Sequence, residues 1–161
     1  MGKVSSKKKI GPLLDKETLL KTKVKEIMNP RPRTIRPETT IKGTMQRLHQ
    51  QIEDCLPVVD EDGKLVGVVT ESDILYALHV TPRRDMVGST MLRQAMKQFA
   101  SNAGELMAKN PISVTPDMSI QETLNVMVEH KHRHIPVVGK NNKLVGLISL
   151  REIISLYNMV K

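Results

Sequence analysis

The chain has 161 residues, of which 39% are hydrophobic and 2% aromatic, so its core must consist mainly of Val, Ile, Leu and Met. This length suits one mid-sized domain or two small domains that share a core. The scarcity of aromatic rings argues against base stacking on single-stranded nucleic acid. The single cysteine, Cys55, excludes an internal disulfide framework and a CxxC metal site, and it fits a reducing cytoplasm.

The first segment of the chain is basic. Residues 1–25 contain eight lysines against two acidic residues, which is +6 of the total charge of +8. The remaining 136 residues are nearly balanced, so a nucleic-acid-binding face on the fold itself is not expected. We expect residues 1–22 to form a flexible basic tail, with weak phosphate contacts by the run Lys7-Lys8-Lys9 as the alternative. Signal-peptide and membrane-spanning patterns are not seen, so a cytoplasmic protein is expected.

An internal repeat organises the chain. When the sequence is shifted by 79 residues, Met28–Leu75 aligns with Met107–Ile154 without a gap, and 13 of the 48 positions are identical. The identities include Pro32, Pro37 and Pro57, and the segments LPVV and KLVG recur as IPVV and KLVG. A gapless match of this length indicates duplication.

Each copy predicts the same order of elements, β-α-β-β-α. In the first copy a short strand at Thr34–Ile35 precedes a helix whose apolar residues recur from Ile41 to Ile52, with Thr39 or Thr40 as its N-cap. A buried strand over 56–59, a turn over 60–63 and a returning strand over 65–69 form a hairpin, and a second helix starts at Glu71. Neither copy of about 50 residues buries much apolar surface alone, so we expect two repeats packed sheet to sheet.

Between the copies, Thr81–Asp85 interrupts the helix and 89–101 again reads as helical. We expect a linker helix over 81–102, and a dimer contact is the alternative for its apolar side. The predicted organisation is a tail over 1–22, repeat 1 over 23–80, the linker, and repeat 2 over 103–161.

The repeat resembles the CBS domain, and the pair resembles a Bateman module. The residues that carry the resemblance are Ile27-Met28, Thr34–Pro37, Leu56–Val59 and Gly67–Asp73, together with Leu106-Met107, Ser113–Pro116 and Ile135–Val138. The resemblance implies an α+β fold with pseudo-twofold symmetry and two clefts between the repeats. It also implies dimers of modules and a regulatory role in which an adenosine-containing ligand is sensed.

In the implied first cleft, an Asp holds the ribose hydroxyls, because a carboxylate accepts from two neighbouring hydroxyls, and a Thr at a helix start lies near phosphate. The residues carried over are Thr70, Ser72 and Asp73 from repeat 1 and Ser113, Val114, Thr115, Ile120, His132, Arg133 and His134 from repeat 2, with Asp54 and Cys55 nearby. Arg133 suits a phosphate because its planar guanidinium donates in pairs. Helix capping is the structural alternative for Thr70 and Asp73.

The second cleft departs from the family pattern. Its residues are Ile35, Arg36, Ser149, Arg151 and Glu152. Glu152 replaces the Asp with a longer side chain, and Glu53 and Asp54 would repel a phosphate. We therefore expect unequal sites, with the first cleft occupied by AMP, ADP, ATP or S-adenosylmethionine. The second is expected to be empty or to hold an uncharged or cationic molecule.

The sequence gives less support to other functions. His130, His132 and His134 alternate along the chain, but no Cys or carboxylate clusters with them in the sequence, so no metal site is expected. No catalytic constellation or GxxxxGK[ST] phosphate loop is present, so neither an enzyme nor a required cofactor is expected. The expected partners are an adenosyl ligand, a second copy of the chain and a separate effector protein. The alternatives are a dimerisation module without a ligand and a nucleic-acid-associated regulator that uses the tail.

Overall fold

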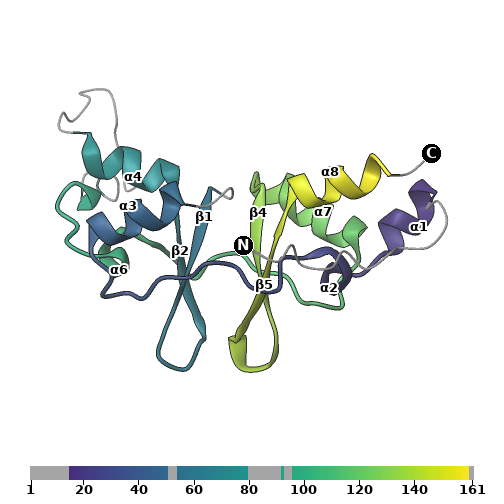
Figure 1. The fold of residues 1–161 in the computed structure, drawn as a ribbon, viewed down its shortest axis with the longest axis horizontal. Helices are drawn as coiled ribbons and strands as arrows, with labels where there is room; N and C mark the ends of the chain where they lie inside the picture. The colour runs from purple at the N-terminus through teal and green to yellow at the C-terminus, as the bar shows by residue number, and fades with distance from the viewer. Residues whose placement is uncertain (1–14, 51–53, 80–91, 93–95, 160–161) are drawn as a thin grey trace, which may run out of the picture.

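The computed structural model describes residues 15–50, 54–79, 92 and 96–159. Two β-hairpins stand side by side at the centre of the molecule, and helices lie on their outer sides (Figure 1). The helices are α1 (Lys16–Lys21), α2 (Val24–Ile27), α3 (Ile41–His49), α4 (Glu71–Leu78), α6 (Ala103–Leu106), α7 (Ile120–His130) and α8 (Leu150–Tyr157). The strands are β1 (Cys55–Val59), β2 (Leu65–Thr70), β3 (Ala108–Lys109), β4 (His134–Val138) and β5 (Leu144–Ser149), and η1 (Lys140–Asn142) is a short 3-10 turn. This mixed α+β fold confirms the predicted class.

Both hairpins form where the sequence predicts them. Strand β1 pairs antiparallel with β2, and β4 pairs with β5 in the equivalent register. The turn between β1 and β2 depends on Asp60, whose Oδ1 accepts from the backbone N–H groups of Asp62 and Lys64 at 3.0 and 2.9 Å. Gly63 completes the turn with a φ of 75°, a conformation that glycine adopts without steric cost.

The helix caps also follow from the sequence. Thr40 accepts from the N–H of Gly43 at 3.1 Å and begins α3, so Thr40 rather than Thr39 is the cap. Ser119 caps α7 in the same way. The short strand predicted at Thr34–Ile35 is reduced to one parallel bridge between Ile35 and Val58.

The first helix of each repeat, the lead-in helix, is exchanged, because it packs against the other repeat. Helix α2 begins repeat 1, but Val24 N–H donates to the carbonyl of Met118 in repeat 2 at 2.9 Å. Helix α6 begins repeat 2, but Ala103 N–H donates to the carbonyl of Thr39 in repeat 1 at 2.8 Å. Each residue of the first pair lies 79 positions from its equivalent in the second pair, so the hydrogen bonds themselves follow the pseudo-twofold symmetry.

The exchange extends into the two cores. One core consists of repeat 2 residues with Val24, and the other consists of repeat 1 residues with Ala103 and Leu106. All three of these lead-in side chains are fully buried. Since apolar burial is the main favourable term in folding, each core depends on both halves of the chain.

Two equivalent glycines allow the exchanged segments to approach the hairpins. Gly67 on β2 faces Met107 and the carbonyl of Ala108, and Gly146 on β5 faces Met28 and the carbonyl of Asn29. A Cβ at either position would lie 2.9 Å from the backbone carbonyl oxygen, closer than side chains tolerate.

The last part of the segment 1–22, which the sequence predicts to be a flexible tail, is helical in the structure. Residues Lys16–Lys21 form α1, which contacts α7 and α8 and buries Leu19. The basic run Lys7–Lys9 and most of the predicted linker helix over 81–102 lie outside the described residues. Within the described ranges, no helix combines the length and apolarity needed to cross a lipid bilayer.

Candidate functional site

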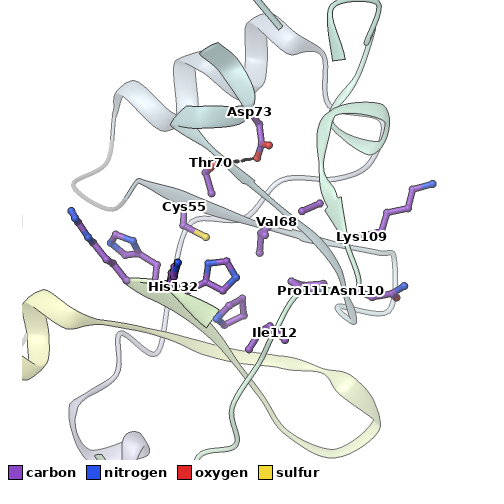
Figure 2. A pocket seen from close by; sticks show the side chains of 14 residues that line it. Cys55, Val68, Thr70, Asp73, Lys109, Asn110, Pro111, Ile112 and His132 are labelled. Carbon is purple, nitrogen blue, oxygen red and sulfur yellow. Dashed lines mark hydrogen bonds between the residues drawn. The ribbon is translucent and has the colours of Figure 1, made fainter. Parts of the chain in front are cut away.

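A cavity of about 430 Å³ lies between the two repeats. Its lining includes Cys55, Val68, Thr70 and Asp73 from repeat 1, Ala108, Lys109, Asn110, Pro111 and Ile112 from the segment that enters repeat 2, and Lys131, His132, Arg133, His134 and Pro136 from repeat 2. Five of the ten residues predicted for the first cleft are in this set: Thr70, Asp73, His132, Arg133 and His134. In Figure 2, Cys55 and Val68 lie between the Thr70–Asp73 pair and His132.

The Thr70–Asp73 pair is held rigidly at the junction of β2 and α4. Asp73 Oδ2 accepts from the backbone N–H of Thr70 at 2.8 Å and from its hydroxyl at 3.1 Å (dashed in Figure 2). Oδ1 accepts from the ammonium group of Lys97, and Asp73 is 7% exposed. The capping contact that sequence reasoning offered as the alternative is therefore present, and Asp73 is also one of the residues that line the cavity.

The opposite wall is cationic. Residues 131–134 follow the end of α7 and lead into β4, and they place three side chains that are or can become positive next to Arg133. Lys131 has a φ of 56°, in the left-handed region that a non-glycine residue enters at a cost of about 1–2 kcal/mol. The rings of His130 and His132 stack with centroids 6.4 Å apart. Among the described residues that line the cavity, Asp73 is the one carboxylate.

Sequence reasoning missed the segment from Ala108 to Ile112. It directly precedes the predicted residues Ser113–Thr115, and it enters the cavity because β3 pairs with β2 of repeat 1, with Val68 opposite Ala108. Lys109 belongs to this segment, but its side chain extends away from the other lining residues in Figure 2. Lys131 was also missed, although it belongs to the same basic run as His132, Arg133 and His134.

Five predicted residues of the first cleft do not line the cavity. Val114 and Ile120 are 1% and 0% exposed and belong to the core of repeat 2. Ser113 is half-buried, whereas Thr115 and Ser72 are exposed to solvent. The side chains of Val114 and Ile120 are apolar, and such side chains are the ones most often buried in a core.

The residues predicted for the second cleft are spread between core and surface. Ile35 is buried in the core of repeat 1, and Arg36 and Arg151 are exposed. Ser149 and Glu152 form a capping box at the start of α8, in which Glu152 Oε2 accepts from the N–H and hydroxyl of Ser149 at 2.6 and 3.0 Å. None of the five lines the cavity described above.

A separate hollow of about 520 Å³ lies along α3. It is lined by Arg33, Thr34, Thr39, Gly43, Gln46, Arg47 and Gln50. Arg47 donates to the Thr34 carbonyl at 2.9 Å and Arg33 donates to Gln50 at 3.0 Å, so both guanidinium groups already have partners within repeat 1. No cluster of three His, Cys, Asp or Glu side chains suited to a metal is found in the part of the chain that the structure describes.

Comparison with known proteins identifies the repeat. The family model of the CBS domain matches residues 24–80 and 103–158. A CBS domain-containing protein of Bacillus subtilis, YhcV, is 32% identical over 131 residues, which is 81% of this chain and 81% of that protein. The matches to the Arabidopsis thaliana proteins CBSX1 and CBSX2 span 59% and 64% of those relatives.

Solved structures of CBS pairs have the same fold. The CBS domain pair of MJ0100, in complex with 5'-methylthioadenosine and S-adenosyl-L-methionine, superposes with a TM-score of 0.69 at 27% identity and covers 85% of this chain and 96% of that one. CBSX2 in complex with AMP has a TM-score of 0.77 at 24% identity over 86% of this chain and 98% of that one. The chain therefore belongs to the CBS domain family and contains two tandem repeats folded as a pair.

Proposed function

We propose that this chain is a regulatory CBS pair whose cavity binds an adenosine nucleotide that carries phosphate. The observation that supports the proposal most directly is the composition of the cavity between the two repeats. It joins a preorganised Thr70–Asp73 pair from repeat 1 to the basic residues 131–134 from repeat 2. A carboxylate that can accept from a ribose diol and a cationic wall that can receive phosphate are thus presented to the same space.

The relatives support the adenosine part of the proposal. The MJ0100 pair binds two adenosine derivatives, one of which is a sulfonium cation. The charge around the present cavity favours a phosphate instead. Lys131 and Arg133 are positive, and they outnumber Asp73, the one carboxylate among the described residues that line the cavity. We therefore expect AMP, ADP or ATP to bind in preference to S-adenosylmethionine.

Calorimetric titration of the full chain tests the ligand class. AMP should bind at least about tenfold more tightly than adenosine, because charge-assisted hydrogen bonds contribute about 1.5–3 kcal/mol each. Arg133→Ala should remove most of that difference, whereas Arg31→Ala, which deletes an exposed arginine outside the cavity, should not. Equal affinity for AMP and adenosine would contradict the phosphate assignment, and absence of binding by every adenosine compound would contradict the function.

Two histidines on the cationic wall are candidate phosphate contacts. An imidazole N–H can donate a hydrogen bond to a phosphate oxygen, so His134→Ala should weaken AMP binding if His134 is the contact. Calorimetric titration that gives the same AMP affinity for the variant and the wild type would exclude His134 from that role.

We propose one nucleotide per chain. The residues of the second cleft lie in the core of repeat 1, at the surface and in the α8 capping box, whereas those of the first face a common cavity. Glu152 also differs from Asp73 in length. A calorimetric stoichiometry near two would contradict this inequality.

We also propose that the protein forms a homodimer through α4 and α8. Leu75 and Ile154 are 63% and 50% exposed, and Leu78 and Tyr157 are 61% and 50% exposed. Within each pair the residues lie 79 positions apart, so the pseudo-twofold symmetry produces two matching apolar patches, and α4 and α8 lie along the same side in Figure 1. Two equivalent patches suit a second copy of this chain, because a twofold interface uses the same surface on both subunits.

Light scattering coupled to size exclusion tests the dimer. Leu78→Glu should shift the protein towards the monomer, and Val128→Glu, at a 78% exposed position of α7 outside the patches, should not. A wild-type monomer would contradict this part of the proposal. A dimer in a protein that binds no nucleotide would favour the alternative of a dimerisation module without a ligand.

We further propose that a separate effector protein reads the occupancy of the cavity in the cytoplasm. Cys55 is the single cysteine of the sequence and its thiol is buried, which suits such a reducing compartment. A nucleic-acid role of the tail can be tested separately by deleting residues 1–14, because deletion to residue 22 would also remove the packed helix α1. Retention of nucleic-acid affinity after this deletion would contradict a role for the tail.

A further inference from the structure

The Asp73 carboxylate, which is proposed above to bind the ribose, already contacts a lysine of the same chain. Lys97 Nζ contacts Asp73 Oδ1, and the two side chains are 13% and 10% exposed. Asp73 Oδ2 accepts twice from Thr70, at 2.8 and 3.1 Å. Donors are therefore in place at both oxygens of the carboxylate.

Lys97 belongs to the segment between the repeats. Residues 96–100 form a single turn, in which Phe99 N–H donates to the Met96 carbonyl at 3.1 Å. Ala100 packs against the core of repeat 1, while Met96 and Phe99 are 65% and 82% exposed. The Lys97–Asp73 ion pair and Ala100 thus attach an otherwise exposed turn to repeat 1.

The ion pair breaks the symmetry of the module. The position equivalent to Lys97 is Thr18, before repeat 1, whose N–H donates to Asp15 at 2.7 Å and whose side chain carries no charge. A lysine at this position is therefore specific to the segment that precedes repeat 2, and it does not follow from the shared repeat pattern.

Asp73 Oδ2 already accepts two hydrogen bonds from Thr70, so a ribose hydroxyl has to use Oδ1, the oxygen that Lys97 contacts. We propose that Lys97 is an internal competitor for Asp73, so that nucleotide binding displaces its ammonium group and releases the turn over residues 96–100. This inference rests on the proposed nucleotide function of the cavity. The attachment of the inter-repeat segment to repeat 1 would then depend on whether the cavity holds a nucleotide.

Thermodynamic linkage gives this competition two measurable consequences. Only molecules in which Lys97 has left Asp73 can bind nucleotide through this carboxylate, so the apparent affinity is the intrinsic affinity multiplied by the fraction of such molecules. Because coupling is reciprocal, bound nucleotide must weaken the attachment of the 96–100 turn by the same factor. A ligand that only rigidified the protein would have the opposite effect on this segment.

Lys97→Met removes the ammonium group and keeps an unbranched apolar chain. It should bind AMP about 5- to 150-fold more tightly than the wild type, the range of typical coupling energies. Lys97→Arg should retain the weak binding, and Lys42→Met, which removes an exposed lysine from α3, controls for the change in net charge. Weaker binding by Lys97→Met would make Lys97 a ligand contact and would overturn the inference.

The outcomes separate this inference from the function on which it rests. If the wild type binds AMP and Lys97→Met binds it equally well, the competition is refuted and the nucleotide function stands. If neither protein binds AMP, ADP or ATP, both fail. Hydrogen exchange of the wild type gives a second test without a variant: amides of residues 96–101 should exchange faster with saturating AMP, and slower exchange would refute the release.

Discussion

Gly67→Ala tests whether close approach of the exchanged segment determines stability. The added methyl would meet Met107 Sδ and Cγ, and it would lie 2.9 Å from the Ala108 carbonyl oxygen. The thioether can rotate away, because methionine is flexible. The carbonyl cannot, because β3 is paired with β2 through Val68 and Ala108. We expect the strand to shift, at a cost of about 2 kcal/mol typical of overpacking.

For a chain of this size, about 2 kcal/mol corresponds to a fall in Tm of roughly 4–8 °C. Gly146→Ala, which approaches Met28 and the Asn29 carbonyl in the same way, should cause a similar fall, and the double variant should show roughly the sum. Gly43→Ala on α3 is the control, because alanine favours a helix by about 1 kcal/mol and its closest new contacts are side-chain atoms at 3.2 and 3.3 Å. Circular dichroism melts that show no fall in Tm for Gly67→Ala and Gly146→Ala would refute the reasoning.

Three further predictions concern the cavity and the contact between the repeats. Lys131→Gly should raise the free energy of unfolding by about 0.5–1 kcal/mol, because glycine adopts the left-handed conformation without strain, and it should weaken AMP binding because a positive side chain is lost. Urea unfolding should therefore show higher stability while calorimetry shows lower AMP affinity. Asp73→Asn should lower the free energy of unfolding by about 2–3 kcal/mol by leaving Lys97 buried without its partner, and adding Lys97→Met should recover part of the loss in a double-mutant cycle. The hydrogen bond from Lys25 lowers the pKa of Asp117, so this carboxylate contributes stability that is fully present above its ordinary pKa of 3.8 and is lost as the pH falls through the lowered value. Asp117→Asn should therefore reduce the loss of unfolding free energy at acidic pH. The same loss in the variant and the wild type would contradict this.

Local structure could be predicted from the sequence because its causes are local. The Asp60–Gly63 turn, the N-cap at Ser119 and the start of α4 at Glu71 depend on residues within a few positions of one another. The 79-residue offset then required the second copy to repeat the first. The early strand was overestimated, because Ile35 pairs with Val58 as a single bridge and propensity alone does not limit its length.

Long-range placement was not predictable in the same way. Periodicity marks Val24 and Leu106 as apolar, but it does not say which repeat they pack against. The lining segment Ala108–Ile112 enters the cavity only through its pairing with β2, and this pairing depends on the exchange. Lys97 reaches Asp73 across 24 positions from a segment whose sequence resembles any amphipathic linker.

Half of the predicted cleft residues line the cavity for a physical reason. Thr70 and Asp73 are fixed by the capping geometry, which can be predicted from the sequence, and residues 132–134 lie at the start of β4, a strand that the sequence also predicts. Val114 and Ile120 have side chains that the core of repeat 2 takes up completely.

The reciprocal exchange also constrains how the chain folds during synthesis. Residues 24–80 leave the ribosome before Ala103 and Leu106, so the first hairpin must wait with an incomplete core and with part of the β2 edge unpaired. Such intermediates are prone to aggregate or to recruit the missing segment from another molecule. A single ancestral repeat would have faced the same shortage permanently and could have met it only in trans, as an intertwined pair of identical chains. Duplication converts that second-order association into an intramolecular step that no longer depends on protein concentration.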